Sequence, residues 1–220
     1  MTPGEIMDKL TKVDFNAEEM LYVLGSASPR RIDMFRDHGF EPVVIPSNGD
    51  ESVPMELGPS ETTMFLALKK ALSVKSQLDM MIKESRVALP GKAVIITADT
   101  IVYQDEILGK PEDRKDAHRI LSKLNNSRHS VITGVALMRI DIPYCKLFAE
   151  ESIVTFHPYD MNELEAYLDT PEAYDKAGAY AIQGTFGKYV KEYTGDIKNI
   201  MGLPWDSLEA ELQKVALIKG

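Results

Sequence analysis

Two short apolar runs, each followed at once by polar residues, set the framework of this chain. The first run covers 20–24 and ends at Gly25, after which Ser28-Pro29 opens a helical pattern. This order predicts a buried strand, a tight turn and a helix. The second run covers 93–98 and is followed directly by Asp99. Strands that alternate with helices in this way predict an α/β fold.

The remaining patterns extend this alternation and add a hairpin, which predicts a mixed sheet. A helix over 60–85 is expected to turn inward Met64, Phe65, Leu68, Ala71 and Leu72, and a helix over 113–124 is expected to turn inward Ala117, Ile120, Leu121 and Leu124. The other expected elements are a strand at 42–46, a strand segment at 101–103 before a turn at 104–106, a hairpin of 129–141 and 146–156, and helices over 160–168 and from Pro204. A capping pattern at 2–5 predicts a short helix over 3–12. That helix belongs to an expected extension of residues 1–19 ahead of one domain over 20–218.

Composition limits the cellular compartment and the classes of binding partner that we expect for this chain. A hydrophobic fraction of 44% over 220 residues is enough to bury a sizeable core. The formal net charge of -9 disfavours nucleic acid and anionic membranes, so a polyanionic ligand has to be met by a local basic cluster. Cys145 is the only cysteine, and no apolar run reaches the roughly 18–20 residues that span a bilayer. We therefore expect a cytoplasmic protein without disulfides, membrane segments or nucleic-acid partners.

The segment Ser26-Ala27-Ser28-Pro29-Arg30-Arg31 is the first candidate for such a basic cluster. It places two hydroxyl groups and two guanidinium groups at a helix start, where free N–H groups and the helix dipole already favour an anion. The segment is not a P-loop, because the Gly-Lys-Ser/Thr of that motif is missing. A well-capped helix with two solvated arginines explains the same residues, so the segment alone leaves both interpretations open.

Three further patterns are candidates for chemistry, and each has a structural alternative. Asp99-Thr100 places a carboxylate at the expected C-terminal end of a strand, where α/β sheets bind ligands, although it also suits an Asx turn. Asp50-Glu51 offers hard oxygen ligands for magnesium, or forms an acidic loop. The small residues of 175–184 suit close packing on a flat base, with Gln183 able to pair with a pyrimidine edge, or form a structural turn. The histidines have no zinc-site spacing.

Taken in order, these segments resemble the Maf family of nucleotide pyrophosphatases, which is related in fold to inosine triphosphate pyrophosphatases. The resemblance covers about residues 21–212 and rests on 24–31, Asp50-Glu51, Lys70-Ala71, Ala98-Asp99-Thr100, Leu108-Gly109-Lys110-Pro111, Thr133-Gly134-Val135, 175–180, Ile182-Gln183-Gly184, and Asn199 with Gly202-Leu203-Pro204. It implies a twisted mixed sheet flanked by helices, arranged in two lobes with a central cleft.

The resemblance also implies an activity, which is hydrolysis of a nucleoside triphosphate to the monophosphate and pyrophosphate. Asp99 takes the role of the base that deprotonates the attacking water. Glu51 and Asp99 are implied as ligands of a divalent cation, Mg²⁺ or Mn²⁺. The implied phosphate-binding residues are Ser26, Ser28, Arg31, Lys70 and Lys110. A homodimer is implied as well.

Three positions separate the branches of the family, and here they are Arg30, Thr100 and Gln183. These residues are similar to those of the branch specific for dTTP and UTP, which implies action on modified pyrimidine nucleotides too and a role in cleaning the nucleotide pool. A branch specific for 7-methyl-GTP tends to have an aromatic residue, glutamine and glutamate at the three positions. The chain departs from the family at Ala181, where glycine is frequent, and in its extension. The alternatives are a 7-methyl-GTP pyrophosphatase and a nucleotide-binding regulator of cell division without turnover.

Overall fold

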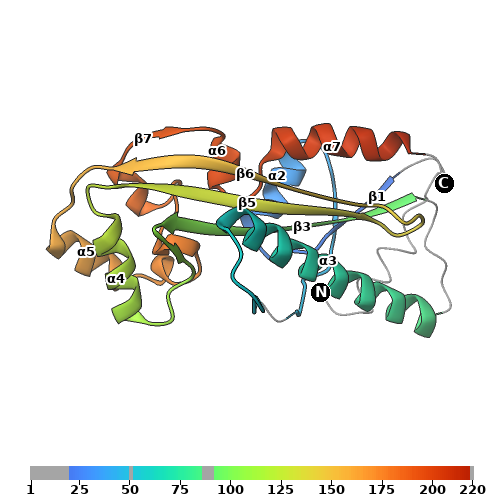
Figure 1. Ribbon diagram of the computed structural model, residues 1–220, viewed down its shortest axis with the longest axis horizontal. Coiled ribbons are helices and arrows are strands. Elements are labelled where there is room, and N and C mark those ends of the chain that lie inside the picture. Colours follow the sequence, from blue (N-terminus) through green and yellow to red (C-terminus); the bar gives the residue numbers. More distant parts are fainter. Residues whose placement is uncertain (1–19, 50–51, 86–91, 219–220) are drawn as a thin grey trace.

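A seven-stranded mixed sheet runs the length of the molecule (Figure 1). The computed structural model describes residues 20–49, 52–85 and 92–218. Its strands are β1 Met20–Leu24, β2 Val43–Val44, β3 Lys92–Gln104, β4 Glu106–Leu108, β5 Arg128–Arg139, β6 Cys145–Phe156 and β7 Val190–Thr194. They follow the order β2-β1-β3-β5-β6-β7, with β4 paired to β3. Pairing is parallel among β2, β1 and β3 and antiparallel elsewhere, so the predicted mixed sheet is confirmed.

Helices cover both faces of this sheet. The α-helices are α2 Pro29–Asp37, α3 Pro59–Ser85, α4 Arg114–Leu124, α5 Met161–Leu168, α6 Ile197–Ile200 and α7 Trp205–Leu217, and short 3-10 helices are η1 Pro171–Ala173, η2 Ala177–Ala179 and η3 Thr185–Tyr189. In Figure 1, α3 lies on one face, and α2 and α7 lie on the other. Successive residues of a strand point to opposite faces. Accordingly Ile95 packs with the buried side of α3, whereas Ile96 packs with α2 and α7.

The two lobes share the long strands of the sheet. One lobe holds α2, α3 and α7, and the other holds α4, α5 and the 3-10 helices, while β3, β5 and β6 pass through both (Figure 1). In the second lobe, α4 buries the four residues predicted from its periodicity. The hairpin of β5 and β6 and the helix starts at Asp160 and Pro204 also match their predictions. The helix expected over 3–12 lies outside the described residues.

The inward face of α3 differs from the predicted one. Leu72 was expected to face the core but is 51% exposed, whereas Thr63, Ala67 and Ala71 are fully buried. The reason is the closeness of the helix to β5. A Cβ atom at Gly134 would lie 2.4 Å from the backbone of Thr63, so only small side chains fit between α3 and the sheet.

The position of Asp99 along its strand also differs from the prediction. It was expected at a C-terminal strand end but lies within β3, which continues to Gln104. Pairing with β5, where Asp99 faces Gly134, keeps the chain extended. The neighbouring strand β1 does end nearby, because its last residue Leu24 pairs with Ile96. Asp99 therefore lies just beyond the parallel part of the sheet, where α/β sheets bind ligands.

A buried arginine holds the C-terminal helix to the hairpin. The side chain of Arg139 is fully buried and forms an ion pair with Asp141. Its Nη1 donates to the carbonyl oxygens of Val215 at 3.0 Å and Ile218 at 3.4 Å. Hydrogen bonds from Arg139 hold the pKa of the Asp141 carboxyl below its usual value of 3.8. Such a carboxylate stabilises the fold above the pKa it has in the unfolded chain, and the contribution is lost as pH falls through the folded-state pKa.

We therefore expect Asp141→Asn to lower the free energy of unfolding by about 1–2 kcal/mol at pH 7, because a buried guanidinium loses its charged partner. The difference in free energy of unfolding between this variant and the wild type should become smaller as pH falls below about 4. Denaturant unfolding at pH 7 and pH 3 measures both effects. Glu192→Gln, on an exposed carboxylate of β7, is the matched control and should change stability by less than about 0.5 kcal/mol. A pH-independent gap for Asp141→Asn would contradict this account.

Candidate active site

A cleft of about 810 Å³ lies between the two lobes. Eight segments line it: the β1–α2 turn with the start of α2, the loop after β2, α3, the middle of β3, β4 with the loop after it, β5 at Val131, the segment 175–183 and the turn at 200–202. The structure brings together here all of the predicted site residues that it describes, namely Ser26, Ser28, Arg30, Arg31, Lys70, Asp99, Thr100, Lys110 and Gln183. Glu51, the other predicted metal ligand, lies outside the described residues. The roles of these residues stay predictions, although their gathering in one cleft is now established.

The β1–α2 turn, which was predicted to bind an anion, lines the cleft. Ser28 is the N-cap residue of α2, but its side chain makes no capping hydrogen bond. Its hydroxyl is therefore not committed to its own helix. Ser26 instead accepts a hydrogen bond from the backbone N–H of Ser28 at 3.2 Å. Pro29 sets the helical φ angle at the first position, so the N-terminus of α2 borders the cleft with its dipole favouring an anion.

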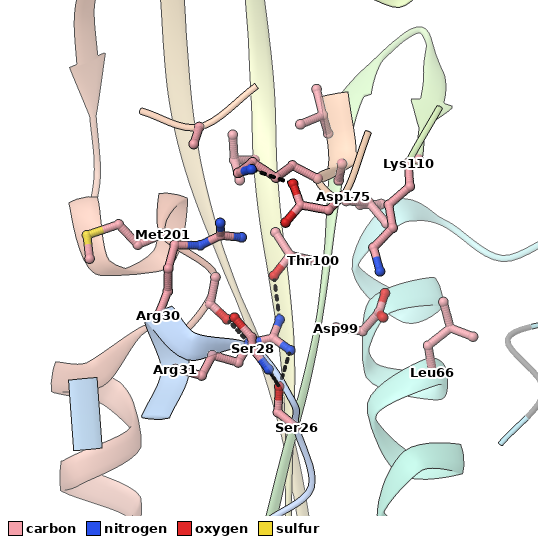
Figure 2. Close-up of a pocket in the computed structure, with 18 of the residues that line it drawn as sticks. Ser26, Ser28, Arg30, Arg31, Leu66, Asp99, Thr100, Lys110, Asp175 and Met201 are labelled. Carbon is pink, nitrogen blue, oxygen red and sulfur yellow. Dashed lines mark hydrogen bonds and ion pairs between the residues drawn. The ribbon is translucent and has the colours of Figure 1, made fainter. Parts of the chain in front are cut away.

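The two neighbouring arginines make very different contacts. Arg31 donates from Nε to the carbonyl of Gly202 at 2.7 Å, from Nη1 to the carbonyl of Ala98 at 2.9 Å, and from Nη2 to Thr100 Oγ1 at 3.0 Å. A longer contact of 3.4 Å joins Nη1 to Ser26 Oγ. Arg30 extends into the cleft from α2 (Figure 2), and within the described part of the chain its guanidinium makes no hydrogen bond.

The carboxylate of Asp99 is held in an ion pair on the α3 side of the cleft. Lys70 Nζ lies 2.5 Å from Asp99 Oδ1, and only 14% and 12% of the two side chains are exposed. Neighbouring Thr97, which points to the same face of β3, donates from Oγ1 to the carbonyl of Ala67 in α3 at 2.6 Å. Helix α3 is thereby fixed to the strand one turn before the lysine. The pair places a charged acceptor and a charged donor together where water is largely excluded.

The opposite wall is built from the loop after β4 and the segment that carries Gln183. The N–H of Gly178 donates to the carbonyl of Gly109 at 3.0 Å, which joins the two segments next to Lys110. Gly178 has a φ of 70°, a conformation that favours glycine, and a Cβ there would lie 2.6 Å from Val102. Lys110 and Gln183 are exposed at the cleft. This wall can present an ammonium group and an amide to a ligand.

A buried hydrogen bond stiffens that wall from behind. The hydroxyl of Tyr180 lies 2.7 Å from Nε2 of His129. Burial lowers the pKa of His129 to about 4, so the ring is neutral at pH 7. Sequence reasoning did not single out this pair, because a lone histidine on β5 and a tyrosine 51 positions later carry no shared pattern. It also missed the carbonyls of Ala98 and Gly202, since backbone acceptors leave no trace in side-chain motifs.

The chemistry of the cleft indicates an enzyme or binding protein for an anionic ligand. It combines a helix N-terminus, five cationic side chains and two ion-paired carboxylates, those of Asp99 and Asp175. Among the residues that the structure describes, no group of three or more histidine, cysteine or acidic side chains could hold a metal ion by itself. None of the described helices is both long enough and apolar enough to cross a membrane.

The chain belongs to the Maf-like protein family, which it matches over residues 22–215. A dTTP/UTP pyrophosphatase of Agathobacter rectalis is 38% identical over 202 residues, covering 89% of this chain and 97% of that protein. A dTTP/UTP pyrophosphatase of Thermoanaerobacter sp. is 41% identical over 191 residues, covering 86% of this chain and 93% of that protein. Among solved structures, the Ham1 protein of Staphylococcus aureus is similar with a TM-score of 0.47 and 13% identity, over 89% of this chain and 99% of that one.

The contacts of the two arginines lead to a stability prediction. We expect Arg31→Met to lower the free energy of unfolding by about 2–4 kcal/mol, because it leaves partly buried carbonyl groups without their charged donors. Arg30→Met, the adjacent control, should change it by less than about 0.5 kcal/mol. Denaturant unfolding of both variants measures the difference. Equal losses at the two positions would show that the contacts of Arg31 contribute nothing of their own.

Proposed function

We propose that this protein hydrolyses nucleoside triphosphates to the monophosphate and pyrophosphate, with dTTP, UTP and modified pyrimidine nucleotides as substrates. The observation that carries the proposal is the ion-paired Asp99 carboxylate inside a cleft bordered by cationic groups and a helix N-terminus. The relatives named as dTTP/UTP pyrophosphatases, which match nearly the whole chain at 38–41% identity, support the reaction type and the substrate class.

Asp99 acts as the general base in this proposal. Lys70 holds Oδ1 by a 2.5 Å contact, and in the described part of the chain no hydrogen bond reaches Oδ2. That oxygen accepts a proton from a water molecule, and the water oxygen attacks the α-phosphorus. The bond between the α-phosphorus and the oxygen that bridges it to the β-phosphorus breaks at the same time. Pyrophosphate leaves with the electron pair of that bond. A fixed carboxylate lowers the barrier because the water is aligned before reaction.

The charge that develops on pyrophosphate is met by groups from both walls. Ser28 and the N-terminus of α2 provide hydrogen bonds that their own helix does not use, and Ser26 stands beside them. Lys110 and Arg30 add positive charge from opposite sides of the cleft (Figure 2). Such preorganised donors stabilise the transition state more than the substrate, since the charge grows as the bond breaks.

The donor set fits a divalent cation. Magnesium normally takes one or two protein carboxylates and completes its shell with phosphate oxygens and water. Asp99 supplies one carboxylate in the cleft and would hold Mg²⁺ or Mn²⁺ together with the substrate, and Glu51 is the second proposed ligand. When bound, the ion would neutralise phosphate charge.

We further propose that Gln183 recognises the pyrimidine edge, because its exposed amide can both donate and accept hydrogen bonds.

Pyrophosphate release from a panel of nucleoside triphosphates, with Mg²⁺ or Mn²⁺, tests the proposal. We expect faster release from dTTP and UTP than from 7-methyl-GTP. Faster cleavage of 7-methyl-GTP would overturn the pyrimidine assignment. Tight binding without turnover at either ion would instead support a nucleotide-binding regulator of cell division.

The role of the base is tested by Asp99→Asn, which keeps the shape of the side chain but removes its basicity. We expect kcat to fall by about 10²–10⁴-fold, the usual contribution of a positioned base, with nucleotide binding retained. Pyrophosphate release and equilibrium binding of dTTP measure the two quantities, and Glu192→Gln outside the cleft is the control. An Asp99→Asn variant with wild-type kcat would rule out the assigned mechanism.

A further inference from the structure

Just before Asp99, strand β3 loses its neighbour on one edge. The N–H of Gly25 donates to the carbonyl of Ile96 at 2.8 Å, and the chain then turns away from β1 into α2. Carbonyl groups two residues apart lie on the same edge of a strand. The carbonyl of Ala98 therefore faces the edge that β1 has left. A buried carbonyl without a donor there would cost about 1–3 kcal/mol.

The guanidinium of Arg31 takes the place of the missing strand. Its Nη1 donates to the carbonyl of Ala98 and its Nη2 to Oγ1 of Thr100. These two acceptors stand immediately before and after Asp99. A guanidinium has five N–H groups, and the contacts with Ala98, Thr100, Ser26 and Gly202 engage four of them. At most one N–H of Arg31 is left for any further partner.

The hydroxyl of Thr100 is committed in a fixed direction. It lies 2.9 Å from Oγ1 of Thr133, its cross-strand partner on β5. Thr133 has one hydroxyl proton and donates it to the carbonyl of Asn199 at 3.1 Å. Thr100 must therefore donate its own proton to Thr133 and accept from Arg31. It has no proton left to offer a nucleotide base.

The end of this chain of hydrogen bonds is rigid. Asn199 is fully buried, and its Nδ2 donates to the carbonyl of Val131 at 3.0 Å and to Ser152 Oγ at 2.9 Å. Thr133 is fully buried as well and is not part of the cleft wall. This series of hydrogen bonds thus connects α2 through β3 and β5 to the start of the 200–202 turn. Arg31 also holds that turn directly, through the carbonyl of Gly202.

We propose that Arg31 and Thr100 are positioning residues, which fix the backbone on both sides of Asp99 and thereby the direction of its carboxylate. Thr100 then affects turnover through this network and not by contact with the base, and the anionic substrate is met by Arg30 in place of Arg31. The inference rests on the proposed function, because Asp99 is the group being positioned. Misplacement of a reacting group by about 1 Å is enough to cost about 10²-fold in rate.

The kinetic test compares Thr100→Val, which keeps the shape but removes the hydroxyl, with Thr100→Ser, which keeps the hydroxyl. For dTTP, Thr100→Val should lower kcat by about 10–100-fold and change KM by less than about threefold. The ratio of kcat/KM between UTP and 7-methyl-GTP should stay as in the wild type, and Thr100→Ser should recover most of the lost kcat. A changed substrate ratio, or equal losses in the two variants, would overturn the positioning role.

A second test extends the network to Thr133 and adds a measurement of thermal stability that does not depend on turnover. Thr133→Val removes the next hydroxyl of the chain from a residue outside the cleft, and it should lower kcat in the same way as Thr100→Val. If the hydroxyls form one network, the sum of the Tm losses of the two single variants will be larger than the Tm loss of the double variant. Additive losses of Tm would overturn the network. A wild-type protein that releases no pyrophosphate would overturn the proposed function instead, so the two failures are distinguishable.

Discussion

The site depends on how closely α3 approaches the sheet. Lys70 can reach Asp99 at 2.5 Å only because the backbone of α3 lies against β5 at Gly134, the cross-strand partner of Asp99. Small side chains at Ala67 and Ala71 permit the same spacing along the helix. The ion pair is mostly buried, and a buried charge without a partner is strongly destabilising, so helix packing and site electrostatics constrain each other.

Asp99 is held from both faces of the sheet by different means. On one face, Lys70 binds its side chain directly. On the other, Arg31 from α2 binds the carbonyl before it and the hydroxyl after it. Strand geometry explains this division, because the side chain of Thr100 points to the face opposite that of Asp99, and the carbonyl of Ala98 lies at the strand edge that β1 has left. The helices on the two faces therefore act on one residue, and neither could replace the other.

Local patterns carried much of the prediction. The buried side of α4, the hairpin of β5 and β6 and the start of α2 follow from periodicity and turn residues within a few positions of each other. The segment 26–31 and Asp99 were singled out because polar and charged groups follow apolar runs, whereas Lys70 and Lys110 were assigned only through the family resemblance. The face of α3 could not be predicted, since it is decided by Gly134, far away in sequence. The continuation of β3 past Asp99 likewise depends on its pairing with β5, which no local signal records.

The glycine at position 134 has a consequence for how the sequence can vary. It does not line the cleft, so inspection of the cleft alone would leave it out. Yet any side chain there would need space that the backbone of Thr63 already occupies, and α3 would have to move away with its lysine. The distance between the backbones of α3 and β5 thus decides whether Lys70 can reach Asp99. No side-chain motif encodes this distance. Which substitutions this protein tolerates therefore depends on the distance between α3 and the sheet as well as on the chemistry of the side chains in the cleft.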